Sequence, residues 1–128
     1  MKTSAADTGL VLIAHGSQEQ NANADAFHLA AELKKRGPYQ IVEVSFLELT
    51  EPTIDQAVRA CLQAGAKTVI LTPYFLSAGV HVRRDLSGVE KRLSDEHLQV
   101  QFRLAEPLGR HPSLVEIVLE RAGAAGAS

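Results

Sequence analysis

The sequence predicts an α/β fold: a four-stranded parallel sheet in the flavodoxin-like order 2-1-3-4, with helices on both faces. Segments of strand and helix character alternate four times along the 128 residues, and this alternation is typical of parallel strands joined by right-handed crossovers. The first strand segment is apolar throughout, as expected for a strand covered on both faces. The fourth alternates apolar and polar residues, which is typical of an edge strand, its place in this order.

The first strand–helix unit begins with the apolar run 10–14, which ends at His15-Gly16-Ser17. A helix is expected over about 19–36, because its apolar residues recur at helical spacing. Three basic residues close this helix and Gly37-Pro38 follows, which is typical of a helix end. The first loop therefore carries a histidine directly after a buried strand.

The second unit begins with the β-branched run 41–46. Thr50-Glu51-Pro52 has the threonine and early proline that suit a helix start, and we expect the helix to end at Gly65. Its apolar stripe contains Cys61, so we interpret this cysteine as a core residue.

The third unit has a strand over 68–71, a loop over 73–80 whose apolar residues follow neither the helical nor the strand period, and a helix over about 81–93. The inward-facing residues of this helix are expected to be Leu86, Val89 and Leu93.

The fourth unit has the alternating strand 98–104 and a last helix that starts at His111-Pro112. His111 is in position to cap this helix. Leu114, Ile117 and Val118 recur in it at helical spacing, and we expect them to form its apolar side.

Composition favours a soluble, cytoplasmic protein that acts on a small molecule or an ion. We expect one domain over 9–122, between flexible ends at 1–8 and 123–128. With 45% hydrophobic and 22% charged residues the chain is near the globular average, and its apolar runs are far too short to span a membrane. We recognise no signal peptide and expect no membrane partner. The single cysteine excludes an internal disulfide and a Cys-x-x-Cys site. The net charge of −2 and the absence of tryptophan argue against a nucleic-acid partner.

Three residues with metal-binding side chains follow the first three strands: His15, Glu48 and His81. They stand at equal intervals, about one strand–helix unit apart, so each occupies the same place in its unit. In open α/β sheets ligands bind at this edge, near the point where the strand order reverses. Two imidazoles and a carboxylate bind first-row divalent metals and leave coordination positions open. The pattern therefore predicts a shared metal site, with unrelated polar residues at loop ends as the alternative.

Groups that bind anions surround these positions. Backbone N–H groups near Ser17, Ser77 and Gly79 are placed to meet a carboxylate or a phosphate. Arg83 and Arg84 add two guanidinium groups close to the second histidine, and guanidinium groups pair with carboxylates. A polycarboxylate substrate fits this set, and an ordinary charged helix face is the alternative for the arginine pair.

Several phrases of the chain resemble, in the same order, the class II chelatases of the sirohydrochlorin chelatase group. The phrases lie between Leu10 and Arg121 and are LVLIAHGS, QNANADAF, FLELTEPTIDQAV, GAKTVILTPYFLSAGVHVRRDL and LGRHPSL. Members of this group insert Co2+ or Fe2+ into the tetrapyrrole sirohydrochlorin on the way to cobalamin or sirohaem, and a related archaeal activity inserts Ni2+. The resemblance implies a chelatase-like fold, no organic cofactor and a divalent ion as substrate.

The resemblance also implies roles for individual residues. In such enzymes histidines after the first and third strands hold the metal, with a glutamate after the second strand in some members; these correspond to His15, His81 and Glu48. The two histidines are then also catalytic, as acceptors of the pyrrole protons. Substrate contacts are expected at Ser17, Ser77, Gly79, Val80, Arg83 and Arg84. Gln18 stands where many relatives have arginine, a departure that concerns the substrate contacts of its loop and not the metal ligands. Longer relatives contain two such domains, so a homodimer is expected to complete the cleft.

Two alternatives use the same positions. A non-catalytic carrier of metal or tetrapyrrole would need the same site and differs from an enzyme in turnover. Histidine phosphatases also have a histidine after the first strand and before a glycine. Ala14 stands where their arginine precedes that histidine, so the cationic stabilisation that phosphoryl transfer needs is missing.

Overall fold

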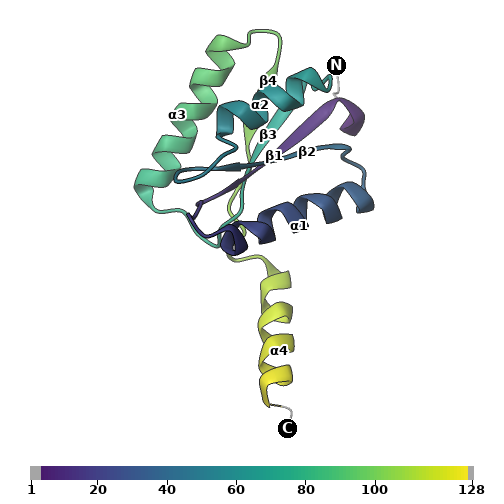
Figure 1. Cartoon of the computed structure of the whole chain (residues 1–128), viewed down its shortest axis with the longest axis vertical. Helices are drawn as coiled ribbons and strands as arrows, with labels where there is room; N and C mark the ends of the chain where they lie inside the picture. Colours follow the sequence, from purple (N-terminus) through teal and green to yellow (C-terminus); the bar gives the residue numbers. More distant parts are fainter. Residues whose placement is uncertain (1–3, 127–128) are drawn as a thin grey trace.

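The structure, a computed structural model, describes residues 4–126 and contains one parallel sheet with the strand order β2-β1-β3-β4 (Figure 1). The strands are β1 (Thr8–Ala14), β2 (Ile41–Phe46), β3 (Thr68–Pro73) and β4 (Gln101–Leu104). Each neighbouring pair is parallel. The predicted α/β class and the predicted order 2-1-3-4 are therefore confirmed.

Four α-helices alternate with the strands: α1 (Gln20–Arg36), α2 (Ile54–Gln63), α3 (Val80–Glu96) and α4 (Pro112–Gly126). A short 3-10 turn over Ala5–Asp7 precedes β1. Regular structure thus extends into both predicted flexible ends, because β1 begins at Thr8 and α4 continues to Gly126. The parts of those ends at 1–3 and 127–128 lie outside the described residues.

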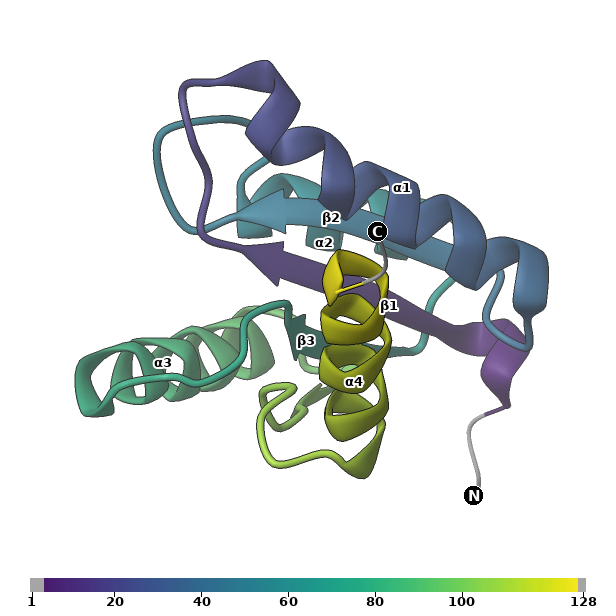
Figure 2. The ribbon, with the colours of Figure 1, turned by 90° about the horizontal axis from the view of Figure 1, so that it is seen from below.

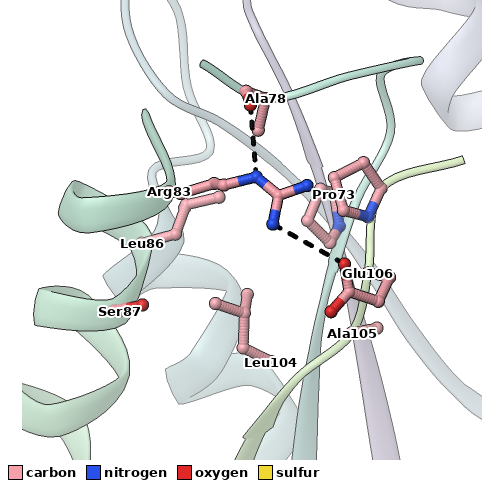
Figure 3. Close-up of a pocket in the computed structure, with 9 residues that line it drawn as sticks. Pro73, Ala78, Arg83, Leu86, Ser87, Leu104, Ala105 and Glu106 are labelled. Atoms are coloured by element: carbon pink, nitrogen blue, oxygen red, sulfur yellow. Dashed lines mark hydrogen bonds and ion pairs between the residues drawn. The ribbon is translucent and has the colours of Figure 1, made fainter. Parts of the chain in front are cut away.

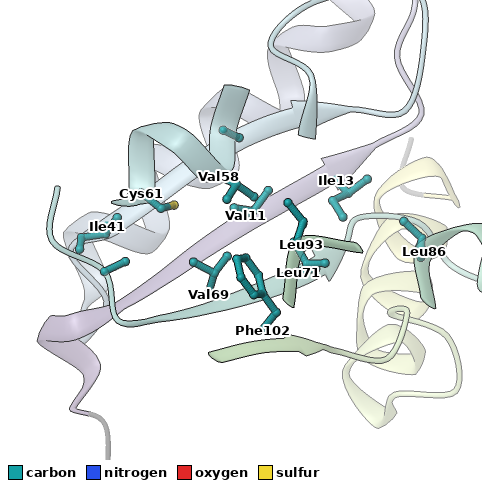
Figure 4. Close-up of a cluster of buried hydrophobic side chains, with 12 residues drawn as sticks. Val11, Ile13, Ile41, Val58, Cys61, Val69, Leu71, Leu86, Leu93 and Phe102 are labelled. Atoms are coloured by element: carbon teal, nitrogen blue, oxygen red, sulfur yellow. The ribbon is translucent and has the colours of Figure 1, made fainter. Parts of the chain in front are cut away.

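The sheet separates two apolar layers, and Figure 2 looks onto the face next to α1, with α1 in front of the strands and α2 behind them. Side chains alternate along β1, so Val11 and Ile13 face α2 and α3, whereas Leu10 and Leu12 face α1. The larger layer is drawn in Figure 4, and its labelled members are Val11, Ile13, Ile41, Val58, Cys61, Val69, Leu71, Leu86, Leu93 and Phe102. Because β1 is central and covered on both sides, its carboxyl end is a rigid platform for the loop that follows.

Cys61 is fully buried in the larger layer, as predicted. Burial raises the pKa of its thiol to about 12. The thiol therefore stays protonated and packs as a small apolar group. Gly9 of β1 lies against it, and a β-carbon at Gly9 would press on the Cys61 sulfur.

Three predicted boundaries were wrong by three residues, and one of them is the end of the third helix, which lies at Glu96 and not at Leu93. The second helix starts after Thr53 and not at Thr50-Glu51-Pro52, because Thr53 and Gln56 cap it reciprocally, with each side chain bonding to the other's backbone N–H. The edge strand begins at Gln101 and not at Leu98, because the N–H of Val100 donates to the carbonyl of His97 and closes a turn there. Leu98, an apolar residue of the predicted strand, lies outside β4 and is exposed.

Helix α4 forms where predicted but does not cover the sheet. His111 caps it as expected, since its Nδ1 accepts from the N–H of Ser113 at 3.1 Å. No residue of α4 is buried, and Ile117 and Val118 are exposed. Figure 1 shows the helix projecting away from the other elements. Within residues 4–126 α4 makes no extensive contact with another element, so its apolar side has no partner there.

The face of the sheet next to α1 is also incompletely covered. Helix α1 contacts β1 and β2. Among the described elements neither α1 nor α4 contacts β3 or β4 extensively. Ile70 is accordingly only half-buried, and Arg103, its neighbour on β4, is exposed.

None of the described helices is long and apolar enough to cross a membrane.

Candidate functional site

The loops after β1, β2 and β3 meet at the carboxyl edge of the sheet, where the strand order reverses around β1. Strand pairing continues into these loops. The N–H of Leu47 donates to the carbonyl of Ala14 at 2.9 Å, and the N–H of Tyr74 donates to the carbonyl of Ile13 at 2.7 Å. These bonds bring the loops after β2 and β3 to either side of the loop after β1, in the position where open α/β sheets bind ligands.

His15 and Glu48 lie beside each other at this edge. The N–H of Glu48 donates to the carbonyl of His15 at 3.2 Å. Gly16 follows with φ of +97°, and a β-carbon there would collide with the Glu48 carbonyl oxygen. The close approach of the two loops therefore requires glycine after the histidine. The His15 and Glu48 side chains are both exposed.

The His15 ring packs on Phe75 from the loop after β3. Their ring centroids are 4.6 Å apart and the planes are inclined by 32°. The N–H of Leu108 in turn donates to the carbonyl of Phe75 at 3.1 Å. The first histidine is thus connected through Phe75 to the segment between β4 and α4.

Asn23 fixes the loop that follows His15, and the sequence reasoning did not select it. Its Oδ1 accepts from the N–H of Ser17 at 3.0 Å and its Nδ2 donates to the Ser17 carbonyl at 2.7 Å. The Ser17 N–H, expected to receive an anion, is therefore already bonded, and the Ser17 hydroxyl accepts from the N–H of Glu19. Asn23 shares the buried side of α1 with Ala26 and Ala30. In the sequence, Asn23 is a polar residue within the apolar stripe of this helix, and that position was the available sign of its structural role.

The remaining predicted residues lie around the start of α3. Gly79 is its N-cap, and Ser77, Val80, His81 and Arg84 are all exposed. Arg83 is oriented by two contacts: its Nε donates to the carbonyl of Ala78 at 3.2 Å, and its Nη1 is 3.8 Å from Glu106. His81 is therefore on a helix start, whereas His15 and Glu48 are joined through the strand ends.

A complete ligand cluster is not assembled in the described part of the chain. Residues 4–126 contain no group of three or more His, Cys, Asp or Glu side chains that could hold a metal ion. The structure brings His15 and Glu48 together through their backbones and does not join His81 to them in such a cluster.

Two neighbouring cavities lie between the start of α3 and the segment after β4. The smaller, of about 160 Å³, is lined by Arg83, Glu106 and apolar side chains such as Leu86 and Leu104 (Figure 3). The larger, of about 450 Å³, shares Arg83 and Glu106 and adds Arg110. Glu106 and Arg110 were not predicted, because they come from a segment without helical or strand period.

Comparisons with known proteins agree with this architecture. The sequence model of the CbiX family matches residues 9–125. The chain is 38% identical over 122 residues to the sirohydrochlorin cobaltochelatase of Priestia megaterium. This match covers 95% of this chain and 40% of that protein. It is 34% identical over 114 residues to the sirohydrochlorin cobaltochelatase of Sulfolobus acidocaldarius, with 89% of each chain covered.

Among solved structures, SirB from Bacillus subtilis with Fe3+ superimposes with a TM-score of 0.84 at 26% identity. The match covers 95% of this chain and 48% of the SirB chain. This chain therefore spans about half the length of the longer relatives that it matches, and nearly all of the shorter ones.

Proposed function

Because the chain belongs to the CbiX family, we propose that it inserts a divalent metal ion into sirohydrochlorin. Co2+ and Fe2+ are the first candidates and Ni2+ is a third, for cobalamin, sirohaem or nickel-tetrapyrrole biosynthesis. The observation that carries the proposal is the direct bond between the backbones of His15 and Glu48 at the switch point of the sheet. This bond supports a site where an imidazole and a carboxylate act on the same ion.

In this proposal the ion is a substrate and is held by His15, Glu48 and His81. A hydrated divalent ion gives up its waters reluctantly, and exchanging some of them for imidazole and carboxylate beforehand lowers the cost of transfer. The three side chains are exposed and not preassembled, which suits an ion that must be bound and then released. His81 completes the set when the ion arrives.

Metal insertion also requires two protons to leave the pyrrole nitrogens. The divalent ion replaces two N–H protons, so two protons leave the macrocycle for every ion that enters, and an acceptor must take them up. Imidazole is the side chain that ordinarily exchanges protons near neutral pH. His15 and His81 are therefore the proposed acceptors, and Arg83 and Arg84 hold the carboxylates of the macrocycle.

We further propose that two copies of the chain form the working enzyme. SirB contains about twice the length of this chain, so a second copy would supply a missing half. The exposed apolar side of α4 and the incompletely covered face of β3 and β4 are two surfaces without a partner in the described residues. A symmetric dimer buries both of these surfaces if α4 of each copy packs on the β3–β4 face of the other copy.

The activity is tested by mixing the purified protein with sirohydrochlorin and Co2+, Fe2+ or Ni2+ in turn. Metallation is followed in the visible spectrum, and the protein-free rate is subtracted. We expect repeated turnover with at least one ion, and its loss in His15→Ala and His81→Ala. His28→Ala, which alters an exposed histidine of α1, is the matched control.

Two outcomes would contradict the proposal. Stoichiometric binding of ion or tetrapyrrole without turnover would identify a carrier. Full turnover in both histidine variants, with circular dichroism unchanged, would exclude these residues from the reaction.

A further inference from the structure

The larger cavity at the carboxyl edge of the sheet has a composition suited to an anion. Its lining comes from the loop before α3, the first turn of α3 and the segment between β4 and α4: Leu76, Ser77, Arg83, Glu106, Pro107, Gly109 and Arg110. Two arginines and one glutamate are the charged members. The free cavity therefore carries an excess of one positive charge once the Glu106 carboxylate has been counted.

The backbone on one side of this cavity is closely fitted. The N–H of Leu108 bonds to the carbonyl of Phe75, and Gly109 lies so near the Leu76 carbonyl oxygen that a β-carbon would collide with it. Arg110 follows with φ of +62°, a left-handed conformation that non-glycine residues seldom adopt. Such a conformation at the wall of a cavity is a frequent mark of a binding position, because the surrounding contacts must maintain it.

The ion pair across the cavity is weak and open to exchange. Arg83 Nη1 and Glu106 Oε2 are 3.8 Å apart, and the two side chains are 58% and 85% exposed. Exposed pairs of this kind contribute little to stability. The guanidinium has five N–H groups, and Figure 3 shows it contacting the Ala78 carbonyl and Glu106. A carboxylate that approached in the plane of the guanidinium would replace Glu106 with better geometry.

We propose that this cavity is a carboxylate subsite of the tetrapyrrole, in which Arg83 and Arg110 bind one peripheral carboxylate and Glu106 occupies its place when the cavity is free. The inference rests on the proposed function, since sirohydrochlorin carries carboxylates around its ring. Phe75 connects the subsite to the metal position, because its ring packs on His15 and its carbonyl holds Leu108. A macrocycle whose nitrogens face His15 therefore extends its edge toward Arg110.

Glu106 and Arg110 should have opposite effects on binding. Removing the Arg110 guanidinium deletes a ligand of the carboxylate, whereas removing the Glu106 charge deletes its competitor. The experiment titrates metal-free sirohydrochlorin into wild-type protein and into Arg110→Gln, Glu106→Gln and Arg59→Gln, following the change in absorbance. Arg59 is an exposed arginine of α2 that does not line the cavity and serves as the matched control.

We expect Kd to rise about tenfold in Arg110→Gln, to fall in Glu106→Gln, and to stay at the wild-type value in Arg59→Gln. Arg110→Gly also removes the guanidinium and relieves the left-handed conformation, so it keeps the test valid if Arg110→Gln does not fold. In turnover assays the Arg110 variants should raise KM more than they lower kcat.

The failure of this inference differs from the failure of the proposed function. If wild-type protein binds sirohydrochlorin and both Arg110 variants bind it equally well, the subsite is refuted while the chelatase activity stands. An unchanged Kd in Glu106→Gln would refute the exchange of carboxylates. If wild-type protein neither binds nor metallates sirohydrochlorin, the proposed function fails and the subsite with it.

Discussion

Asn23 shows how one buried polar side chain sets the geometry of the His15 loop. Both ends of its amide bond to the backbone of Ser17, across the turn between β1 and α1. Asn23 is buried and the Ser17 backbone that it bonds is partly buried, so water replaces these bonds less readily than at an exposed turn. The loop between His15 and α1 therefore depends on Asn23 for its shape.

Replacing Asn23 with alanine should destabilise the protein by about 2 kcal/mol, because two hydrogen bonds to the partly buried Ser17 backbone are lost. Urea unfolding measures the change. Asn21→Ala is the control, since Asn21 is exposed on the same helix and should change the free energy of unfolding little. Equal stability of the two variants would show that the Asn23 bonds contribute nothing measurable.

Individual site residues differ in how well the sequence could predict them. His15 directly follows a buried strand, and Glu48 follows the next strand after one residue, so the strand order alone places them at one edge. His81 follows an irregular loop whose path no periodicity determines. Glu106 and Arg110 reach the same edge through a second irregular segment, and only the folded chain shows that they line a cavity with Arg83.

At the scale of elements, helix ends depend on side-chain bonds that the apolar pattern does not report. The apolar spacing predicted all four helices, because the apolar residues of each recur with the helical period. It did not distinguish Thr50 from Thr53 as the start of α2. The reciprocal bonds of Thr53 with Gln56 decide between them, and the glutamine three residues after Thr53 was the available signal.

Thr53→Ala should therefore lower the free energy of unfolding by about 1 kcal/mol, the usual cost of losing a cap. Thr50→Ala is the matched comparison, because it removes the other threonine of the predicted helix start and leaves the capping box intact. Chemical denaturation of both variants in parallel gives the difference. A larger loss in Thr50→Ala than in Thr53→Ala would be incompatible with the cap at Thr53.

At the scale of the whole molecule, the sequence predicted the sheet and its core but not the position of α4. A period of apolar residues indicates that one side of a helix is buried and does not indicate which surface buries it. For α1, α2 and α3 that surface is the sheet of the same chain. For α4 no surface within residues 4–126 covers the apolar side of the helix, which remains exposed. An amphipathic helix without a partner among the described residues favours association.

The dimer proposal predicts that a charge on the apolar side of α4 yields monomers. Val118 is 65% exposed and lies with Val115 and Leu119 along one shallow groove. Val118→Glu should leave the fold of the single chain intact, because the side chain packs on nothing essential there. In the dimer the same substitution buries two carboxylates by symmetry, at a cost of several kcal/mol.

Sedimentation velocity at micromolar concentration should give about twice the chain mass of 13.8 kDa for the wild type and the single-chain mass for Val118→Glu. Glu116→Gln, on the polar side of α4, should remain dimeric. Metal insertion should decline with the dimer in Val118→Glu, because a cleft built from two copies is then incomplete. A monomeric wild type with full turnover would instead mean that one copy of the site at His15 is sufficient.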